Sequence, residues 1–215
     1  MGLETSMGLE TSMGLETLGG YCEGGASGKN RTYCKGGARM RHSKNEEFDA
    51  IIVGAGPAGI FAALELAARS DSRILLVEKG ADIAERHCPA RVTGSCIHCS
   101  TCAITSGWGG AGAFSDGKLT LGAEVGGWLG EYVEPDVLRG LIADVDATYR
   151  EFGAPDVLYG DDAETFEHWA DRAAREGLRL VRSPVRHLGT ERAARILSAM
   201  RARLEKRVTI LTHTA

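Results

Sequence analysis

The stretch DAIIVGAGPAGIFAALELA, residues 49–67, and the stretch ILLVEKG, residues 74–80, decide the fold of this 215-residue chain. The apolar runs AIIV and ILLV within them predict two strands that are buried on both faces of a parallel sheet. Between the two runs, apolar residues recur at helical spacing from Ile60 to Ala67. The order strand, helix, strand predicts an α/β fold with a Rossmann-like parallel sheet.

A glycine-rich turn, GAGPAG at residues 54–59, joins the first predicted strand to the helix. In this position Gly54 permits a tight turn, Gly56 lets the backbone approach a pyrophosphate, and Gly59 lets helix and strand pack closely. The amides at the start of the helix then bind the pyrophosphate. We expect the dinucleotide to contact Gly54, Ala55, Gly56, Pro57, Ala58 and Gly59.

A carboxylate stands at the end of the second predicted strand. Glu78 lies about 20 residues beyond Gly59, where a carboxylate accepts hydrogen bonds from a ribose diol. Its negative charge disfavours a 2′-phosphate, so the site favours FAD or NAD over NADP. The alternative is a glycine-rich turn without a ligand, and the surrounding strands, helix and acid argue against it.

These segments resemble the N-terminal signature of flavoproteins with a glutathione-reductase-like FAD domain, in which Pro57-Ala58 and Glu78-Lys79-Gly80 are frequent. Further motifs resemble a family of prokaryotic FAD-dependent dehydrogenases. They are CP at 88–89 with the cysteines that follow it, GWGGAGAFSDGKLTL at 107–121, EVGGWL at 124–129, FGAP at 152–155 and RHLGTER at 186–192. The resemblance implies an FAD domain, FAD as the cofactor and a cofactor contact from Lys79, and it implies no particular substrate.

The glycine-rich segment from Gly107 to Gly130 excludes a long regular helix. Its small residues permit close backbone approach to a ligand, and Lys118 is able to stabilise negative charge on a reduced flavin. The alternative is a surface loop with an ordinary turn at Ser-Asp-Gly. The family resemblance implies cofactor contacts from Gly109, Gly110, Gly112, Ser115 and Lys118.

Four of the six cysteines crowd between residues 88 and 102: Cys88, Cys96, Cys99 and Cys102. Their spacing is compatible with zinc or an iron-sulfur cluster, with His87 and His98 as further candidate ligands. In the bacterial ferredoxin pattern the fourth cysteine and its proline come last, whereas Cys88-Pro89 comes first here. A metal site, a redox dithiol and thiols that only pack therefore remain three open interpretations.

The second half of the chain returns to helical patterns. Pro135 suits the first turn of a helix that stops at Gly153, and a second helix is expected over residues 163–176. Thr190 is expected to cap a third helix, whose apolar face leads to a strand at 208–212. The segment His187 to Glu191 is either a surface turn with this cap or, by the family resemblance, a stretch close to cofactor or substrate.

The first 47 residues form a predicted low-complexity extension, with a repeated MGLETS motif, many glycines and a basic stretch from Lys29 to Lys44. It is interpreted either as a disordered tail or as a basic targeting arm, and Met7, Met13 and Met40 are alternative starts. Residues 48–215 form the predicted FAD-binding domain, with a Gly- and Cys-rich excursion at about 86–130. The domain is expected to be incomplete at its C-terminus.

The composition narrows the function classes. The net charge of −4 disfavours nucleic acid, and no run of apolar residues is long enough for a membrane span or a signal peptide, so a cytoplasmic location is expected. The sequence predicts the N-terminal part of an FAD-dependent oxidoreductase. An NAD-dependent dehydrogenase domain and a non-catalytic truncated fragment are the alternatives. Catalytic residues, substrate, electron donor and oligomeric state are left unassigned.

Overall fold

The computed structural model of the chain describes residues 47–215, so the predictions made for residues 1–46 lie outside the described part. Within it, five strands carry the sheet structure. They are β1 (Ala50–Val53), β2 (Ile74–Val77), β3 (Lys118–Thr120), β4 (Val185–His187) and β5 (Val208–Leu211).

Helices and short helical turns connect the strands. The α-helices are α1 (Pro57–Arg69), α2 (Ala90–Thr93), α3 (Pro135–Glu151), α4 (Ala163–Arg175) and α5 (Thr190–Leu204). The 3-10 turns are η1 (Ile83–Glu85), η2 (Ala111–Phe114) and η3 (Leu129–Glu131). The predicted absence of a long helix between Gly107 and Gly130 is confirmed, since this segment holds only two of these turns and the short strand β3.

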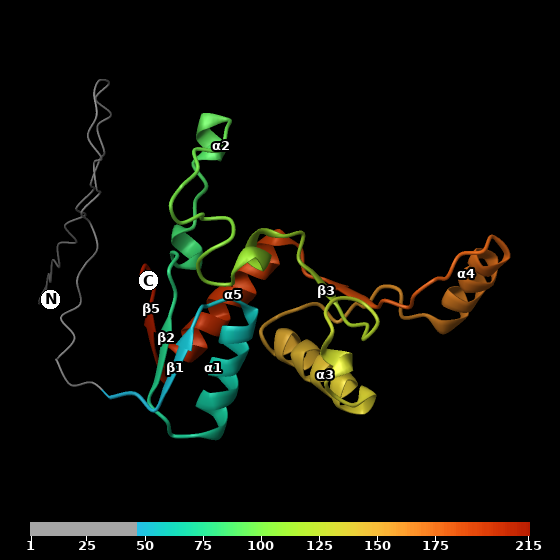
Figure 1. The fold of residues 1–215 in the computed structure, drawn as a ribbon, viewed down its shortest axis with the longest axis horizontal. Coiled ribbons are helices and arrows are strands. Elements are labelled where there is room, and N and C mark those ends of the chain that lie inside the picture. The colour runs from blue at the N-terminus through green and yellow to red at the C-terminus, as the bar shows by residue number, and fades with distance from the viewer. Residues whose placement is uncertain (1–46) are drawn as a thin grey trace, which may run out of the picture. The chain divides into compact units, whose positions relative to one another are not determined.

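The central sheet is parallel, with the strand order β1-β2-β5 (Figure 1). Ala50 stands opposite Ile74, and Ile74 stands opposite Val208, so the three strands start in step. Both connections are crossovers between neighbouring parallel strands, α1 in the first and α5 at the end of the second. The predicted α/β fold with a Rossmann-like sheet is confirmed.

The hydrophobic core lies between this sheet and the helices α1 and α5. Ile60 and Ala63 of α1 meet Ile74 and Leu76 of β2 in one buried cluster. From α5 the buried contributors are Ala193, Ile196, Leu197, Met200 and Leu204. The predicted apolar face of this last helix is therefore confirmed.

The opposite face of β1 is not buried as expected. Ile51 is 62% exposed and Val53 is 85% exposed, although the run AIIV predicted a strand covered on both faces. The physical reason is the direction of the chain. Successive crossovers that advance the same way across a parallel sheet place their helices on the same face, and α1 and α5 do so here (Figure 1).

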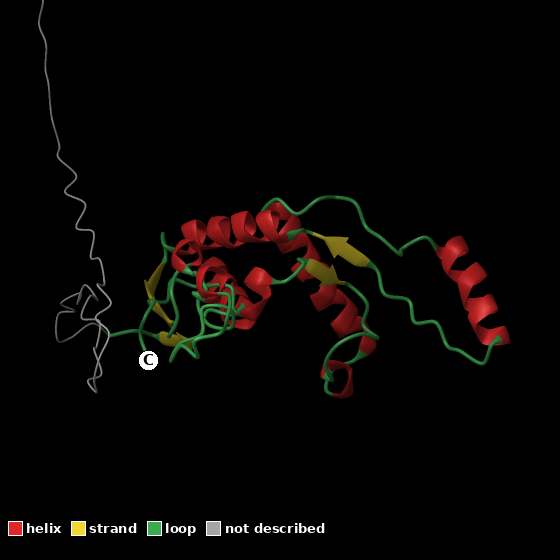
Figure 2. Cartoon of the chain, turned by 90° about the horizontal axis from the view of Figure 1, so that it is seen from above, coloured by secondary structure: helices red, strands yellow, loops and turns green. Residues whose placement is uncertain are grey.

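A second, two-stranded sheet pairs β3 with β4 in antiparallel fashion, and Figure 2 shows these strands as two arrows running in opposite directions. The helix α3 begins with Pro135 at its first turn and ends at Glu151, before Gly153 in the left-handed region at φ 101°. Both boundaries confirm the predicted start and stop. The helix α4 also forms where it was predicted, and none of its side chains is buried.

One predicted helix cap is wrong by one position. The residue before α5 is Gly189, at φ 73°, and Thr190 is the first helical residue. The hydroxyl of Thr190 donates a hydrogen bond to the Ser115 carbonyl at 3.2 Å instead of accepting one from its own helix. A distant partner therefore takes the place of the local cap. None of the helices in residues 47–215 has both the length and the apolar character needed to cross a membrane.

Candidate dinucleotide-binding site

The turn between β1 and α1 adopts the geometry that its glycines predict. Gly54 has a φ of 99°, which L side chains rarely adopt, and its amide donates to the Val77 carbonyl at 2.7 Å. A Cβ on Gly59 would stand 1.9 Å from the Gly54 carbonyl oxygen, so only glycine permits this contact of helix and turn. The first and third glycines thus have structural tasks that need no ligand.

Gly56 has no such task. A Cβ placed on it would meet no protein atom within 4 Å, and its backbone, at φ −73° and ψ 178°, is open to any residue. No side chain caps the start of α1, and its first turn carries no acidic residue. The N-terminal end of α1 therefore has amides without a side-chain cap and a positive dipole potential, and there is free space beside it. These properties suit the binding of a phosphate group.

Glu78 is buried at the end of β2, with 6% of its surface exposed. One carboxylate oxygen accepts a hydrogen bond from the Ala55 amide at 2.8 Å. The other accepts from the amides of Gly80 and Gly107, at 2.8 and 2.9 Å. Glu78, the residue predicted to bind the ribose, thus joins the fingerprint turn to the glycine-rich loop. Three of its roughly four acceptor sites are taken, and the oxygen that bonds Ala55 keeps one for a ribose hydroxyl.

The charge on Glu78 is favoured in the fold. Burial by itself raises the pKa of this carboxyl, but the three backbone amides and the nearby Arg86 guanidinium outweigh burial and lower the pKa below its ordinary value. A carboxylate at this position at neutral pH is what the discrimination against a 2′-phosphate requires.

Arg86 is a central residue of the site that sequence reasoning missed. Its side chain is only 2% exposed, and its guanidinium lies 4.7 Å from the centroid of the Phe114 ring. Four main-chain carbonyls accept its hydrogen bonds, at 2.7–2.9 Å: those of Ala103, Ile104, Trp108 and Gly110. Because every residue carries such a carbonyl, no sequence motif marks the partners of this arginine.

The loop that Arg86 holds lies directly against the fingerprint turn. The Gly109 amide donates to the Ala55 carbonyl at 2.8 Å, and a Cβ on Gly110 would stand 3.2 Å from the Gly56 Cα. Trp108, fully buried, anchors the loop to α5 by donating from Nε1 to the Leu197 carbonyl. The structure thus brings together two predicted cofactor segments that are about 50 residues apart in sequence.

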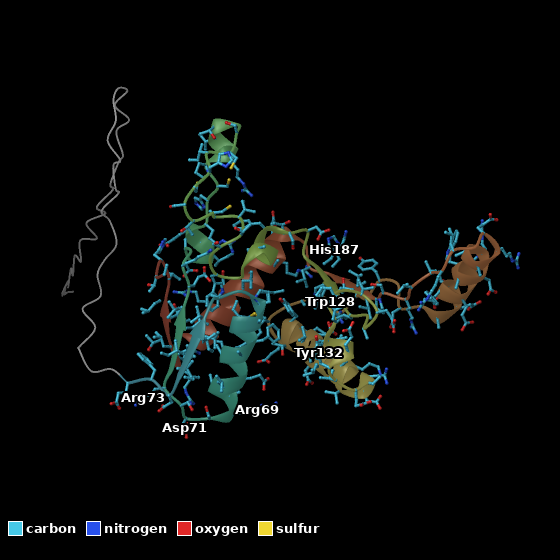
Figure 3. All side chains as sticks on the ribbon, in the orientation of Figure 1. Arg69, Asp71, Arg73, Trp128, Tyr132 and His187 are labelled. Atoms are coloured by element: carbon cyan, nitrogen blue, oxygen red, sulfur yellow. The ribbon has the colours of Figure 1, made fainter. Side chains whose placement is uncertain are left out.

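The rest of the predicted loop lies beside the RHLGTE segment. Lys118 forms an exposed ion pair with Asp116 at 2.8 Å, and this lysine lowers the pKa of the Asp116 carboxyl. His187 contacts the Asp116 carbonyl at 3.2 Å, and the Leu188 amide donates to the Gly117 carbonyl. Figure 3 shows the His187 side chain at the β3–β4 pair. The Lys79 side chain is exposed.

A cavity of about 750 Å³ opens between α1, α3 and the glycine-rich loop. Its walls include six of the residues predicted to contact the cofactor: Pro57, Ala58, Gly109, Gly112, Ser115 and Lys118. On the α1 side it extends past Phe61 to Arg69, which lies at the far end of that helix (Figure 3). The Tyr149 ring packs near Phe61 at 5.7 Å between centroids, and burial raises the pKa of this tyrosine. The volume is in the range of small-molecule sites.

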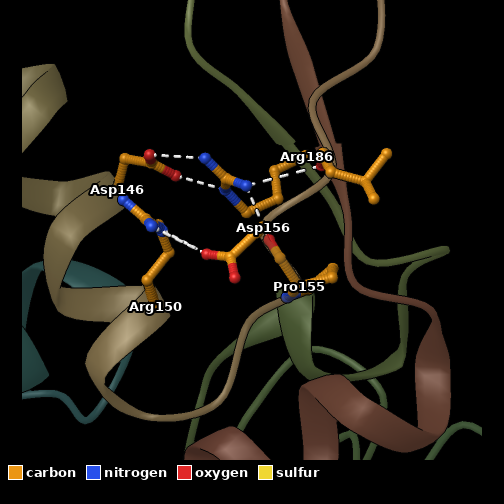
Figure 4. Close-up of polar contacts among 6 residues, drawn as sticks. Asp146, Arg150, Pro155, Asp156 and Arg186 are labelled. Carbon is orange, nitrogen blue, oxygen red and sulfur yellow. Dashed lines mark hydrogen bonds and ion pairs between the residues drawn. The ribbon is translucent and has the colours of Figure 1, made fainter.

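The wall formed by α3 is fixed by a second buried arginine (Figure 4). Arg186 of β4, 4% exposed, donates to both carboxylate oxygens of Asp146 at 2.5 and 2.7 Å. It also donates to the Pro155 carbonyl at 2.6 Å, and the Asp146 carboxylate raises the pKa of the guanidinium. The ion pair therefore fastens α3 and the segment that follows it to the β3–β4 pair.

The four cysteines between residues 88 and 102 form no metal-binding cluster within the part of the chain that the structure describes. In residues 47–215, no three side chains of His, Cys, Asp or Glu lie close enough together to hold one ion. Cys96, Cys99 and Cys102 are exposed free thiols, and Cys88 is partly buried. The metal interpretation gains no support from this geometry, while the dithiol and packing interpretations stay open at this point.

The geometry defines a class of site: a dinucleotide-binding turn in an α/β domain. Residues 52–103 match the model of the NAD(P)-binding Rossmann-like domain. The matched segment runs from β1 through the glycine turn, α1, β2 and Arg86 to the cysteine segment. No curated protein matches the chain. The chain thus carries a Rossmann-like dinucleotide-binding domain, a kind of domain that points to an oxidoreductase.

Proposed function

We propose that this chain is the FAD-binding part of an FAD-dependent oxidoreductase. The observation that carries the proposal is the open space at Gly56, beside the uncapped amides of α1 and the buried carboxylate of Glu78. Rossmann-like domains of the matched type are common in FAD-dependent oxidoreductases. The resemblance of the sequence to flavoproteins is a second reason to propose FAD rather than NAD.

In this proposal each end of the dinucleotide has its own residues. The amides at the start of α1 bind the pyrophosphate, and the Glu78 carboxylate accepts from the ribose hydroxyls. The flavin end enters the cavity near Gly112, Ser115 and Lys118, which line its wall. Bound FAD supplies the capacity to accept and donate electrons, and the protein binds, orients and electrostatically tunes it. Lys118 contributes positive charge at the flavin end.

NAD is the second candidate, because the matched domain model is described as NAD(P)-binding. Both nucleotides share the ADP half that Gly54 to Gly59 and Glu78 recognise, so these residues favour neither. The two candidates differ in the ring that the cavity receives.

The identity of the retained nucleotide tests the proposal. The purified chain is heat-denatured and the released nucleotide is identified by chromatography, while the native protein is reduced with dithionite and followed by its absorbance. FAD in the supernatant, with a yellow native protein that bleaches, is the expected result. Release of NAD supports the second candidate, and a colourless chain with no affinity for added FAD contradicts the proposal.

A further inference from the structure

Three exposed cysteines lie at a regular spacing next to the loop that Arg86 holds: Cys96, Cys99 and Cys102. The spacing creates two Cys-x-x-Cys pairs that share Cys99. Two intervening residues allow the Cα atoms of such a pair to approach to the roughly 4.4–6.8 Å that a disulfide needs. Their exposure makes all three accessible to a reactant in solution.

The two ends of this triplet differ in how they are held. Cys102 begins a turn in which its carbonyl accepts from the amides of Thr105 and Ser106, at 3.2 and 2.9 Å. The carbonyls of the two residues that follow Cys102 are fixed by Arg86, at 2.9 and 2.8 Å. Cys96 has a local hydrogen bond instead, in which the His98 amide donates to its sulfur at 3.5 Å. Cys102 is therefore the member of the triplet that the fold holds in a defined environment.

That environment stabilises a thiolate. The Arg86 guanidinium, which donates to the Ala103 and Ile104 carbonyls, brings positive charge next to Cys102. Hydrogen bonding by the turn at Thr105 and Ile104, together with this charge, holds the pKa of the Cys102 thiol below its ordinary value. An exposed thiol in an electropositive setting has the properties of reactive cysteines rather than of structural ones.

We propose that Cys102 and Cys99 form a thiol–disulfide exchange site, in which Cys102 attacks small disulfides and Cys99 resolves the mixed disulfide. This proposal does not depend on the identity of the bound dinucleotide. Cys99 is the resolving partner because it is the nearest cysteine to Cys102 in the chain. Within residues 47–215 no three candidate ligand side chains stand together around one position.

The external disulfide is the oxidant, and it takes up the two electrons that the two cysteines lose. The Cys102 thiolate forms a bond to one sulfur of the disulfide, and the other sulfur leaves as a thiolate that takes up a proton. Cys99 then loses its proton and attacks the Cys102 sulfur, which expels the second thiol. One disulfide is reduced to two thiols, and the chain is oxidised by the same two electrons to a Cys99–Cys102 disulfide.

The test follows each cysteine separately. A chain with Cys22 and Cys34 changed to serine is reduced, freed of reductant and mixed with oxidised glutathione. It is quenched with an alkylating agent and mapped by mass spectrometry. The expected product is the Cys99–Cys102 disulfide, with two glutathione molecules released per chain. Cys99→Ser is expected to accumulate a stable glutathione adduct on Cys102.

Two further variants decide the assignment. Cys102→Ser is expected to slow the reaction about tenfold or more, because the more reactive thiolate is lost. Cys96→Ser is the matched control, because Cys96 is also exposed and has the same spacing from Cys99, and the rate of this variant is expected to stay unchanged. Equal reaction at all three cysteines, or a Cys96–Cys99 disulfide as the main product, overturns the proposal. So does stoichiometric zinc in the purified chain that blocks exchange until a chelator removes it.

Discussion

Two buried arginines, Arg86 and Arg186, hold two different parts of the molecule by two different means. Arg86 donates to four main-chain carbonyls and forms no ion pair at hydrogen-bond distance in the described residues. Arg186 forms a two-pronged ion pair with Asp146 (Figure 4). The first shapes a loop at the dinucleotide turn, whereas the second fastens the helix α3. In this molecule a buried positive charge thus fixes the path of the main chain in one place and fastens a helix in the other.

The largest effect is expected from Arg86→Met, which breaks the first of these two arrangements. It leaves four carbonyls without their donor, and we expect a loss of roughly 3–5 kcal/mol in the free energy of unfolding. Because the loop from Trp108 to Gly110 loses its anchor, dinucleotide affinity falls as well. Urea denaturation and calorimetric titration measure the two effects. Arg91→Met, at an exposed position in the same segment, is the control and is expected to change neither quantity.

Arg186→Met breaks the second arrangement. It leaves the partly buried Asp146 carboxylate without its partner, at an expected cost of roughly 2–3 kcal/mol. The double variant Arg186→Met with Asp146→Leu is expected to recover at least half of that loss, because both charges are then gone. Because α3 forms a wall of the cavity and is not part of the glycine turn, the loss of dinucleotide affinity is expected to be smaller than for Arg86→Met. An affinity loss equal to that of Arg86→Met would erase the distinction between the two arginines.

Glu78→Gln tests the buried carboxylate that lies near Arg86 and accepts hydrogen bonds from three backbone amides. The amide side chain replaces one acceptor oxygen by a donor that faces backbone amides, at an expected cost of about 1.5–3 kcal/mol at neutral pH. Since the folded-state pKa of Glu78 is lowered, its carboxylate stabilises the fold above the unfolded-state pKa. That contribution is lost as the pH falls through the folded-state value. The stability difference between wild type and variant should therefore shrink on acidification, and a constant difference would contradict the assignment.

Lys118→Ala is expected to have the smallest effect on stability. The lysine and its partner Asp116 are exposed, so the change in the free energy of unfolding should stay below about 0.5 kcal/mol. Lys118 is proposed to stabilise negative charge on the reduced flavin, so the quantity to measure is the reduction potential of the bound cofactor. A variant with unchanged flavin affinity and unchanged potential would remove the charge-stabilising role from Lys118.

Local features of the fold were predictable from the sequence. The strands β1, β2 and β5 and the helices α1, α3 and α4 form where apolar periodicity and boundary residues place them. The steric tasks of Gly54 and Gly59 follow from rules that act within a few residues. Features decided by distant parts of the chain were not predictable. The exposure of Val53 depends on where α5 returns to the sheet, and the hydrogen bond of Thr190 depends on Ser115, remote in sequence.

The residues of the candidate site also fall into two groups, those that local sequence patterns predict and those that depend on distant parts of the chain. The glycine turn and Glu78 were found because their chemistry needs fixed residue types at a fixed spacing. Arg86 was missed, since its partners are main-chain carbonyls. Arg186 stands in the RHLGTER motif, but its role was not assigned, since its partner Asp146 lies about 40 residues away in the helix α3. Sequence patterns show which side chains a site requires, but they do not show what holds those side chains in place.

The most direct test of the central claim is a calorimetric titration of the wild-type chain and of Gly56→Ala with FAD. The added methyl group meets no protein atom within 4 Å, so stability should change by less than about 0.5 kcal/mol. It occupies the space proposed for the pyrophosphate, so affinity for FAD should fall at least about tenfold. Gly140→Ala, which adds the same methyl group to an open position on α3, should leave affinity unchanged. Equal FAD binding by wild type and Gly56→Ala would contradict the claim that this turn binds the cofactor.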